Sequence, residues 1–290
     1  IIQSSSATTV MVVGFVNSGI MKLTQSVGVI LGANVGTTAT AWILSLAEIS
    51  GTGFFMKLLK PTSFSPVLAI IGVFMIMMAK KEKYKDIGSI MVGFAILMFG
   101  MDTMSTAVEP LAESPQFSSI LLMFSNPVLG MLAGLVLTAV IQSSSASIGI
   151  LQALCVTGAV SYSTALPIIM GQNVGTCVTA LISSAGAGKN GKRAALIHLY
   201  YNIIKTVGFM VIFYSLHAVL NFALMETSIS ALGVAVEHTA FNVVAVVLIA
   251  PFSALLEKMV YITIPETQEE LEAQKNKKDV QILDPRFLNT

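Results

Sequence analysis

Two polar tetrapeptides, both Gln-Ser-Ser-Ser, interrupt the apolar sequence at residues 3–6 and 142–145. Each supplies three hydroxyl groups and one carboxamide, which together can donate and accept hydrogen bonds. A helix that breaks beside such residues also leaves backbone N–H groups that favour an anion, and carbonyl groups that favour a hard cation such as Na⁺. The tetrapeptides therefore predict a site for an anion, for Na⁺, or for both.

A second pair of motifs follows the tetrapeptides: GANVGTT at residues 32–38 and GQNVGTC at residues 171–177. Each combines an Asn and a Thr with two glycines, which let the backbone bend or approach a neighbour closely. Tight helix packing through small residues is the alternative explanation of such glycines. Because both motifs lie at the same distance from a tetrapeptide, we expect them to form walls of the same site.

The two sets of motifs belong to an internal repeat. A shift of 139 residues, the distance from Gln3 to Gln142, aligns residues 2–41 with 141–180 without a gap. The same shift carries 61–79 onto 200–218 and 87–108 onto 226–247. This pattern predicts one fold made of two copies of the same unit.

The composition is that of a membrane protein. Of 290 residues, 54% are hydrophobic and 11% are charged, with a mean hydropathy of +0.82, whereas soluble domains carry roughly 25% charged residues. The net charge of +1 favours no nucleic-acid partner, and we expect Cys155 and Cys177 to be free, buried thiols. The segments long enough to cross the hydrocarbon core are 24–47, 61–79, 87–108, 163–186, 195–219 and 231–256.

The stretch 127–160 differs from these spans. Its arms, 127–141 and 146–160, would each form about 22 Å of helix, which is too short to cross a membrane core of about 30 Å. We therefore expect a re-entrant hairpin with its polar tip, Gln142 to Ser145, at mid-depth. Two short crossing helices, whose serines bond back to their own turns, are the alternative.

Lysine and arginine residues predict which loops face the cytoplasm. They concentrate at 80–85, at 188–193 and in the tail after residue 257, while 108–116 and 220–228 carry none. With three crossings between the two tetrapeptides, the second copy is inverted relative to the first. The predicted fold is thus an all-α polytopic membrane protein with two inverted-topology repeats, each with a re-entrant QSSS hairpin and three transmembrane spans, as in secondary transporters.

We divide the chain into a first transporter repeat over 1–112, a second over 113–260 and a charged cytoplasmic tail over 261–290. The first repeat lacks a counterpart of residues 127–140, so we expect it to be truncated at its N-terminus. Neither motif region contains Lys or Arg, and an anion buried there alone would be costly. Cations that enter with the anion would remove this cost, which favours symport.

The paired QSSS segments, each followed by G-x-N-V-G-T, resemble the type II sodium–phosphate cotransporter family, in particular its bacterial branch. The resemblance covers about residues 1–260. It implies import of inorganic phosphate with Na⁺ across the bacterial inner membrane, with Na⁺ as the coupling ion and no other cofactor. By the resemblance, the residues that bind substrate and Na⁺ are Gln3, Ser4, Ser5, Ser6, Gln142, Ser143, Ser144 and Ser145, together with Asn34, Thr37, Asn173 and Thr176 of the second motifs.

The segments HLYYN at 198–202 and HTAFN at 238–242 are also similar to elements of that family. For His198 and His238 we expect hydrogen bonds between helices rather than ion binding. The tail from residue 265 is similar to the junction before a PhoU-like domain, so such a domain or another cytoplasmic regulator is an expected partner, beside the lipid bilayer.

Three alternative functions compete with phosphate symport. One is Na⁺-coupled transport of another oxyanion, such as sulfate or a dicarboxylate, and another is a phosphate sensor or scaffold that moves nothing. An enzyme is disfavoured, because the phosphate-loop-like segment 186–193 has Arg193 where a Ser or Thr is needed. The sequence also lacks a G-x-S-x-G element for a serine hydrolase.

Overall fold

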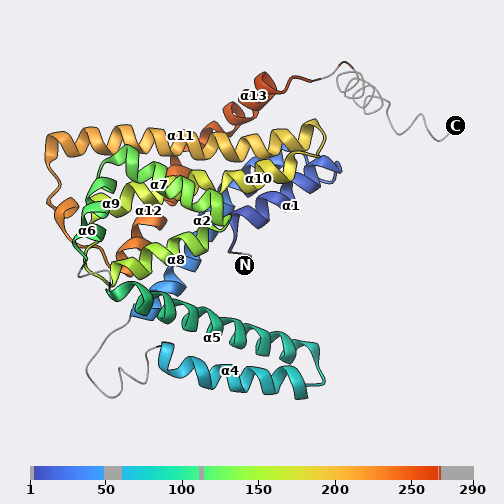
Figure 1. The fold of residues 1–290 in the computed structure, drawn as a ribbon. Coiled ribbons are helices and arrows are strands. Elements are labelled where there is room, and N and C mark those ends of the chain that lie inside the picture. The colour runs from blue at the N-terminus through green and yellow to red at the C-terminus, as the bar shows by residue number, and fades with distance from the viewer. Residues whose placement is uncertain (1–2, 49–60, 111–113, 267, 269–290) are drawn as a thin grey trace.

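The computed structural model describes residues 3–48, 61–110, 114–266 and 268, and these form helices with one isolated β-bridge between Ser161 and Ser228 (Figure 1). Most of the predicted tail, 261–290, lies outside the described residues. The predicted all-α architecture is confirmed. The helices are α1 (Ser5–Asn17), α2 (Leu23–Ser45), η1 (Leu46–Glu48), α4 (Pro61–Met78), α5 (Glu82–Val108), α6 (Pro115–Phe124), α7 (Pro127–Ile141), α8 (Ser144–Cys155), α9 (Tyr162–Gly175), α10 (Cys177–Ser184), α11 (Lys189–Leu220), η3 (Ala223–Glu226), α12 (Ala231–Ile249), η4 (Ala250–Phe252) and α13 (Ser253–Thr263).

Five helical stretches of the described chain are long and apolar enough to cross a membrane: Leu23–Ser45, Glu82–Val108, Tyr162–Ser184, Lys189–Leu220 and Ala231–Thr263. The predicted span 61–79 corresponds to α4, whose described apolar part, Ser63–Met78, is shorter than these. Many large apolar side chains are exposed, for example Val219 (81%) and Val140 (78%). Such surfaces are stable against lipid but not in water, so the chain is a multi-pass membrane protein.

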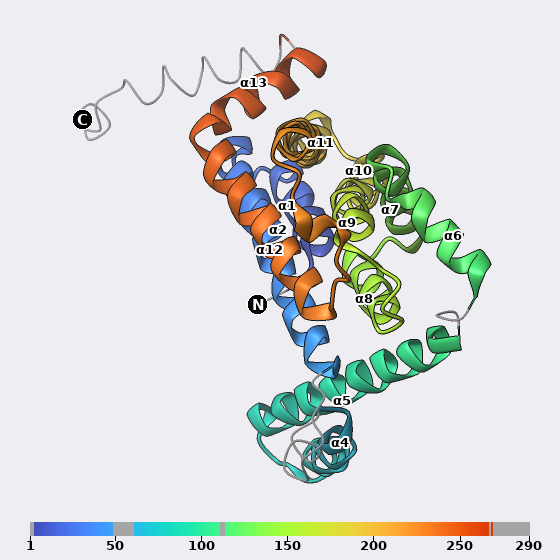
Figure 2. The same ribbon diagram turned by 90° about the vertical axis from the view of Figure 1, so that its left-hand side faces the viewer.

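The body of the molecule contains α1, α2 and α7 to α12, and α12 lies along α2 although the two helices belong to different repeats (Figure 2). Gln152 of α8 is fully buried and its amide nitrogen joins two neighbouring helices. It donates to the carbonyls of Ala41 in α2 at 2.9 Å and Ala231 in α12 at 2.8 Å. Because each unpaired buried polar group costs free energy, these bonds fix α8 against elements of both repeats.

Helices α7 and α9 approach each other closely through glycines. A Cβ atom built on Gly171 would overlap the Met131 carbonyl oxygen, and one on Gly175 would lie 2.6 Å from the Leu135 carbonyl oxygen. Their repeat mates, Gly32 and Gly36, have nothing within 4 Å of such an atom. Gly171 and Gly175 of GQNVGTC therefore serve tight helix packing, the alternative to a role in the walls of the site.

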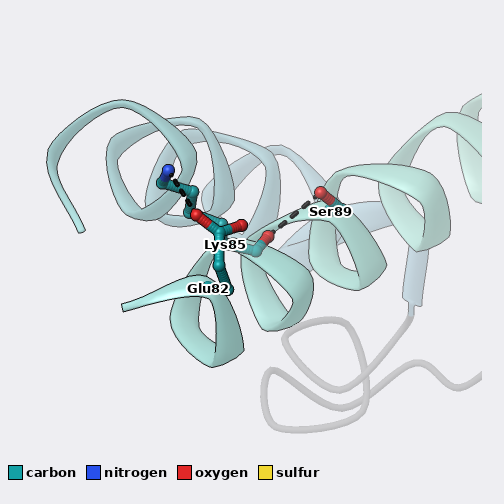
Figure 3. A network of polar contacts seen from close by, with 3 residues as sticks. All are labelled: Glu82, Lys85 and Ser89. Carbon is teal, nitrogen blue, oxygen red and sulfur yellow. Dashed lines mark hydrogen bonds and ion pairs between the residues drawn. The ribbon is translucent and has the colours of Figure 1, made fainter. Parts of the chain in front are cut away.

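Helices α4 and α5 form a pair at one side of the body (Figures 1 and 2), where α5 packs against α8 and α4 packs mainly against α5. Gly72 and Gly88 allow their backbones to meet. At the start of α5, Lys85 forms an exposed ion pair with Glu82 at 2.9 Å, and the Ser89 hydroxyl donates to the Lys85 carbonyl (Figure 3). An exposed pair contributes about 0–1 kcal/mol, so this contact adds little to stability.

The placement of α4 differs from that of its repeat mate. The repeat pairs α4 with α11, which packs against α1, α2, α9 and α10, whereas α4 packs mainly against α5. The buried polar residues Asn202 and Lys205 of α11 correspond to Ser63 and Pro66 of α4. Helix α4 thus lacks the lysine whose ammonium group bonds α11 to α2, α9 and α12.

Replacing Gly171 with Ala tests the close approach of α7 and α9. The added methyl group must push the helices apart, and such overpacking lowers stability by about 1–3 kcal/mol. Gly32→Ala is the matched control, and because its site is open and helical, stability should stay the same or rise slightly. Melting of the purified protein in detergent measures both. Equal melting temperatures would contradict the packing described here.

Candidate functional site

Each Gln-Ser-Ser-Ser segment breaks the helix with the same local geometry. Gln3 and Gln142 have φ angles of 56° and 58°, in the left-handed region that few non-glycine residues occupy. Ser4 and Ser143 follow in extended conformation, and each side chain caps the next helix by accepting from a backbone N–H at 3.2 Å, that of Ala7 or Ala146. The predicted break between α7 and α8 is confirmed, and its geometry occurs in both repeats.

The first tip, residues 3–6, packs against α2. The Ser5 backbone N–H donates to the Thr37 hydroxyl at 2.8 Å, and the Thr40 hydroxyl donates to the Gln3 carbonyl at 3.3 Å. The Ser6 hydroxyl is buried and has no hydrogen-bond partner among the residues that the structure describes. Thus the first tip contacts the second motif of its own repeat and retains an unsatisfied hydroxyl.

The second tip, residues 142–145, lies at the N-terminus of α8, which is held by α7 and α9. One turn into α8, Ser147 accepts from the Thr138 hydroxyl at 2.8 Å, and its carbonyl accepts from the Gln172 side chain at 3.0 Å. Ser144 is buried, at 8% exposure, and Ser145 is partly exposed. The positive end of the α8 dipole is therefore located at these two serines.

The two tips are not hydrogen-bonded to each other within the described residues, but one cavity lies between their supporting elements. This cavity, of about 280 Å³, is lined by Ser145 of α8 and by Thr40 of α2, which bonds the first tip. Met101 and Met104 of α5 form much of its apolar wall. Most of the lining is apolar and none of the lining residues belongs to the first tip, so the prediction that both tips face a shared space stays a prediction.

The second motifs meet at a buried lysine, Lys205 of α11, which is 3% exposed. Its ammonium nitrogen lies 3.0 Å from the side-chain oxygen of Asn173 and 3.4 Å from that of Asn34. A third asparagine oxygen, from Asn242 of α12, lies 2.7 Å away. One charged group therefore joins the Asn residues of both repeats.

Each of these asparagines is held in the same orientation. The side-chain nitrogens of Asn34, Asn173 and Asn242 donate to carbonyls one turn earlier in their own helices, at 2.9, 2.8 and 2.8 Å. Since the amide nitrogens are engaged, the three oxygens point toward Lys205. The rings of Tyr201 and Phe241 add faces at 4.9 and 5.0 Å from the ammonium group, which stabilise a cation further.

Lys205 corrects the expectation that the motifs have no fixed countercharge. Within the described part of the chain, no carboxylate pairs with it, so the site carries a positive charge where an anion was expected to need one. The residue was missed because it is distant in sequence from both motifs. A single Lys inside the apolar segment 195–219 was the available signal, since ionisable residues within spans mark functional sites.

The remaining predicted residues take different positions. Thr37 accepts from the first tip, whereas its mate Thr176 lies at the junction of α9 and α10 and donates to the Asn173 carbonyl at 2.5 Å. Cys155 and Cys177 are buried thiols, and neither is part of a disulfide. The predicted hydrogen bonds from His198 are wrong, because neither ring nitrogen has a partner among the described residues.

The hydroxyls and helix N-termini lie at the two QSSS tips, and the ammonium group lies among the asparagines of the second motifs. These groups can bind an oxyanion by hydrogen bonds and charge. The hard side-chain oxygens can also bind Na⁺. These residue types are suited to ion binding, and the binding role of the tetrapeptides stays a prediction.

Comparison with known proteins identifies the family. The family model described as Na⁺/Pi-cotransporter matches the chain twice, over residues 1–106 and 96–239. The uncharacterized protein YqeW of Bacillus subtilis is 29% identical over 266 residues, which cover 91% of this chain and 81% of YqeW. No solved structure matches the chain.

Two further relatives have names that state a function. YjbB of Salmonella typhimurium, named as a candidate inorganic phosphate export protein, is 27% identical over 89% of this chain and 45% of its own length. The chain thus spans about half of that relative. Rat sodium-dependent phosphate transport protein 2A is 36% identical over 123 residues, 39% of this chain and 19% of its own. With both repeats matched by the family model, the chain belongs to the Na⁺/Pi-cotransporter family.

Proposed function

We propose that this chain forms the transport unit of a Na⁺-coupled carrier of inorganic phosphate. The observation that carries the proposal is the contact of Lys205 with Asn34 and Asn173, one from each repeat. This contact places a positive charge beside the asparagine of each second motif. The proposed binding set comprises Lys205 and the twelve motif residues Gln3, Ser4, Ser5, Ser6, Asn34, Thr37, Gln142, Ser143, Ser144, Ser145, Asn173 and Thr176.

The charge of the site supports coupling to Na⁺. One ammonium group balances one negative charge, so a doubly charged phosphate would still leave excess charge in a buried site. A Na⁺ ion that binds with the phosphate removes this excess, and unsatisfied oxygens such as that of Ser6 are suitable ligands. The names of the family and of the rat relative agree with this coupling.

The direction of transport follows from the ion gradients. We propose import, because Na⁺ gradients across bacterial inner membranes drive symported solutes inward. The YjbB relatives are named for export, and the same carrier would run outward if the gradients were reversed. Export is therefore the second candidate.

We further propose that the repeats are inverted in the inner membrane, with re-entrant QSSS hairpins and a cytoplasmic C-terminus. The support is the equal geometry of the two helix breaks and the positive charge of residues 188–193 at the start of α11. A cytoplasmic PhoU-like domain or other regulator would then lie on the side of the tail.

Cysteine labelling tests this topology. Ser114→Cys should react with an impermeant thiol reagent from the outside of intact cells, and Asn190→Cys only after the membrane is opened. The native Cys155 and Cys177 are buried, so the unsubstituted protein gives the background. Labelling of both positions from one side would contradict inversion.

Transport itself is tested with the intact protein in proteoliposomes. Labelled phosphate should accumulate under an inward Na⁺ gradient, and much less when choline or K⁺ replaces Na⁺. Equal uptake in all three salts would contradict coupling, and uptake of sulfate or a dicarboxylate in place of phosphate would identify another oxyanion carrier. Binding of phosphate without flux in either direction would indicate a sensor.

A further inference from the structure

The three oxygens around Lys205 form a cation site. Asn34 comes from α2, Asn173 from α9 and Asn242 from α12, and their side-chain oxygens lie 3.4, 3.0 and 2.7 Å from the ammonium nitrogen. Three amide oxygens match the three N–H donors of an ammonium group. The same oxygens are the ligand type that a hard cation such as Na⁺ prefers.

The orientation of the asparagines does not depend on Lys205. Each amide nitrogen is bound to the carbonyl of its own preceding helical turn, so the oxygens would remain directed at the same point if the lysine side chain were shortened. They would then be buried and without a donor. Unsatisfied buried oxygens of this kind favour the entry of a cation.

We infer that the ammonium group of Lys205 is a tethered cation that occupies a position where Na⁺ would otherwise bind. Under the proposed function, on which this reading of the coupling rests, the carrier therefore binds one Na⁺ fewer than it would with this position open. The second repeat supplies both Lys205 and Asn242. At the matching positions the first repeat has Pro66 and Thr103, so it has no lysine that could take the place of a Na⁺ ion in the same way.

Removal of the lysine side chain should open the position. Lys205→Ala, purified in detergent without phosphate, should bind one more ²²Na⁺ per chain than the unsubstituted protein. Na⁺ at about ten times its dissociation constant should also raise the melting temperature of this variant by about 3–6 °C more than that of the unsubstituted protein. Choline at equal ionic strength should not produce this shift.

Two variants make the measurement specific. Lys189→Ala removes an exposed lysine of the same helix and should respond to Na⁺ as the unsubstituted protein does. The double variant Lys205→Ala with Asn242→Ala removes the oxygen nearest to the ammonium group and should lose the additional Na⁺.

Several results would overturn the inference. A folded Lys205→Ala protein that binds no additional Na⁺ would do so, as would additional binding that persists in the double variant. If Lys205→Ala folds only when Na⁺ is present, the inference is supported; if Na⁺ does not restore folding, the position requires lysine itself and the inference fails. None of these readouts involves phosphate or transport, so they stand or fall separately from the proposed function.

Discussion

The arrangement of the core depends on one buried charge. An ammonium group inside a membrane protein is costly unless polar partners surround it, and Lys205 finds them on three other helices: α2, α9 and α12. These helices come from both repeats. The need to satisfy one charge therefore requires the two second motifs to lie together, and it holds α11 against the body while its mate α4 packs elsewhere.

This constraint separates two roles within one short motif. In GQNVGTC, Gly171 and Gly175 face α7 and allow the backbones to meet, while Asn173 faces Lys205. One face of α9 thus packs against α7, and another face contacts Lys205. In GANVGTT the Asn has the same role, whereas the glycines are open.

Local features of the fold could be predicted from the sequence. The bounds of α7, 127–141, and the break at Gln142 follow from apolar length and from a serine that caps the next helix, which are properties of neighbouring residues. Asn34 and Asn173 both contact Lys205, whereas the repeat predicts only that their motifs line the same site. The partners of Lys205, the position of the α4–α5 pair and the unpaired ring of His198 depend on contacts between distant segments, which one sequence does not specify.

The central claim is that both repeats contribute to one phosphate site. Equilibrium binding of phosphate to the intact protein tests it, with Ser5→Ala and Ser144→Ala compared against Ser119→Ala, an exposed serine that bonds to its own helix. Loss of a hydroxyl that binds the anion costs about 1–3 kcal/mol, so each tip variant should bind phosphate roughly five- to 150-fold more weakly. The control should bind normally. Unchanged affinity in either folded tip variant would contradict a site shared by the two repeats.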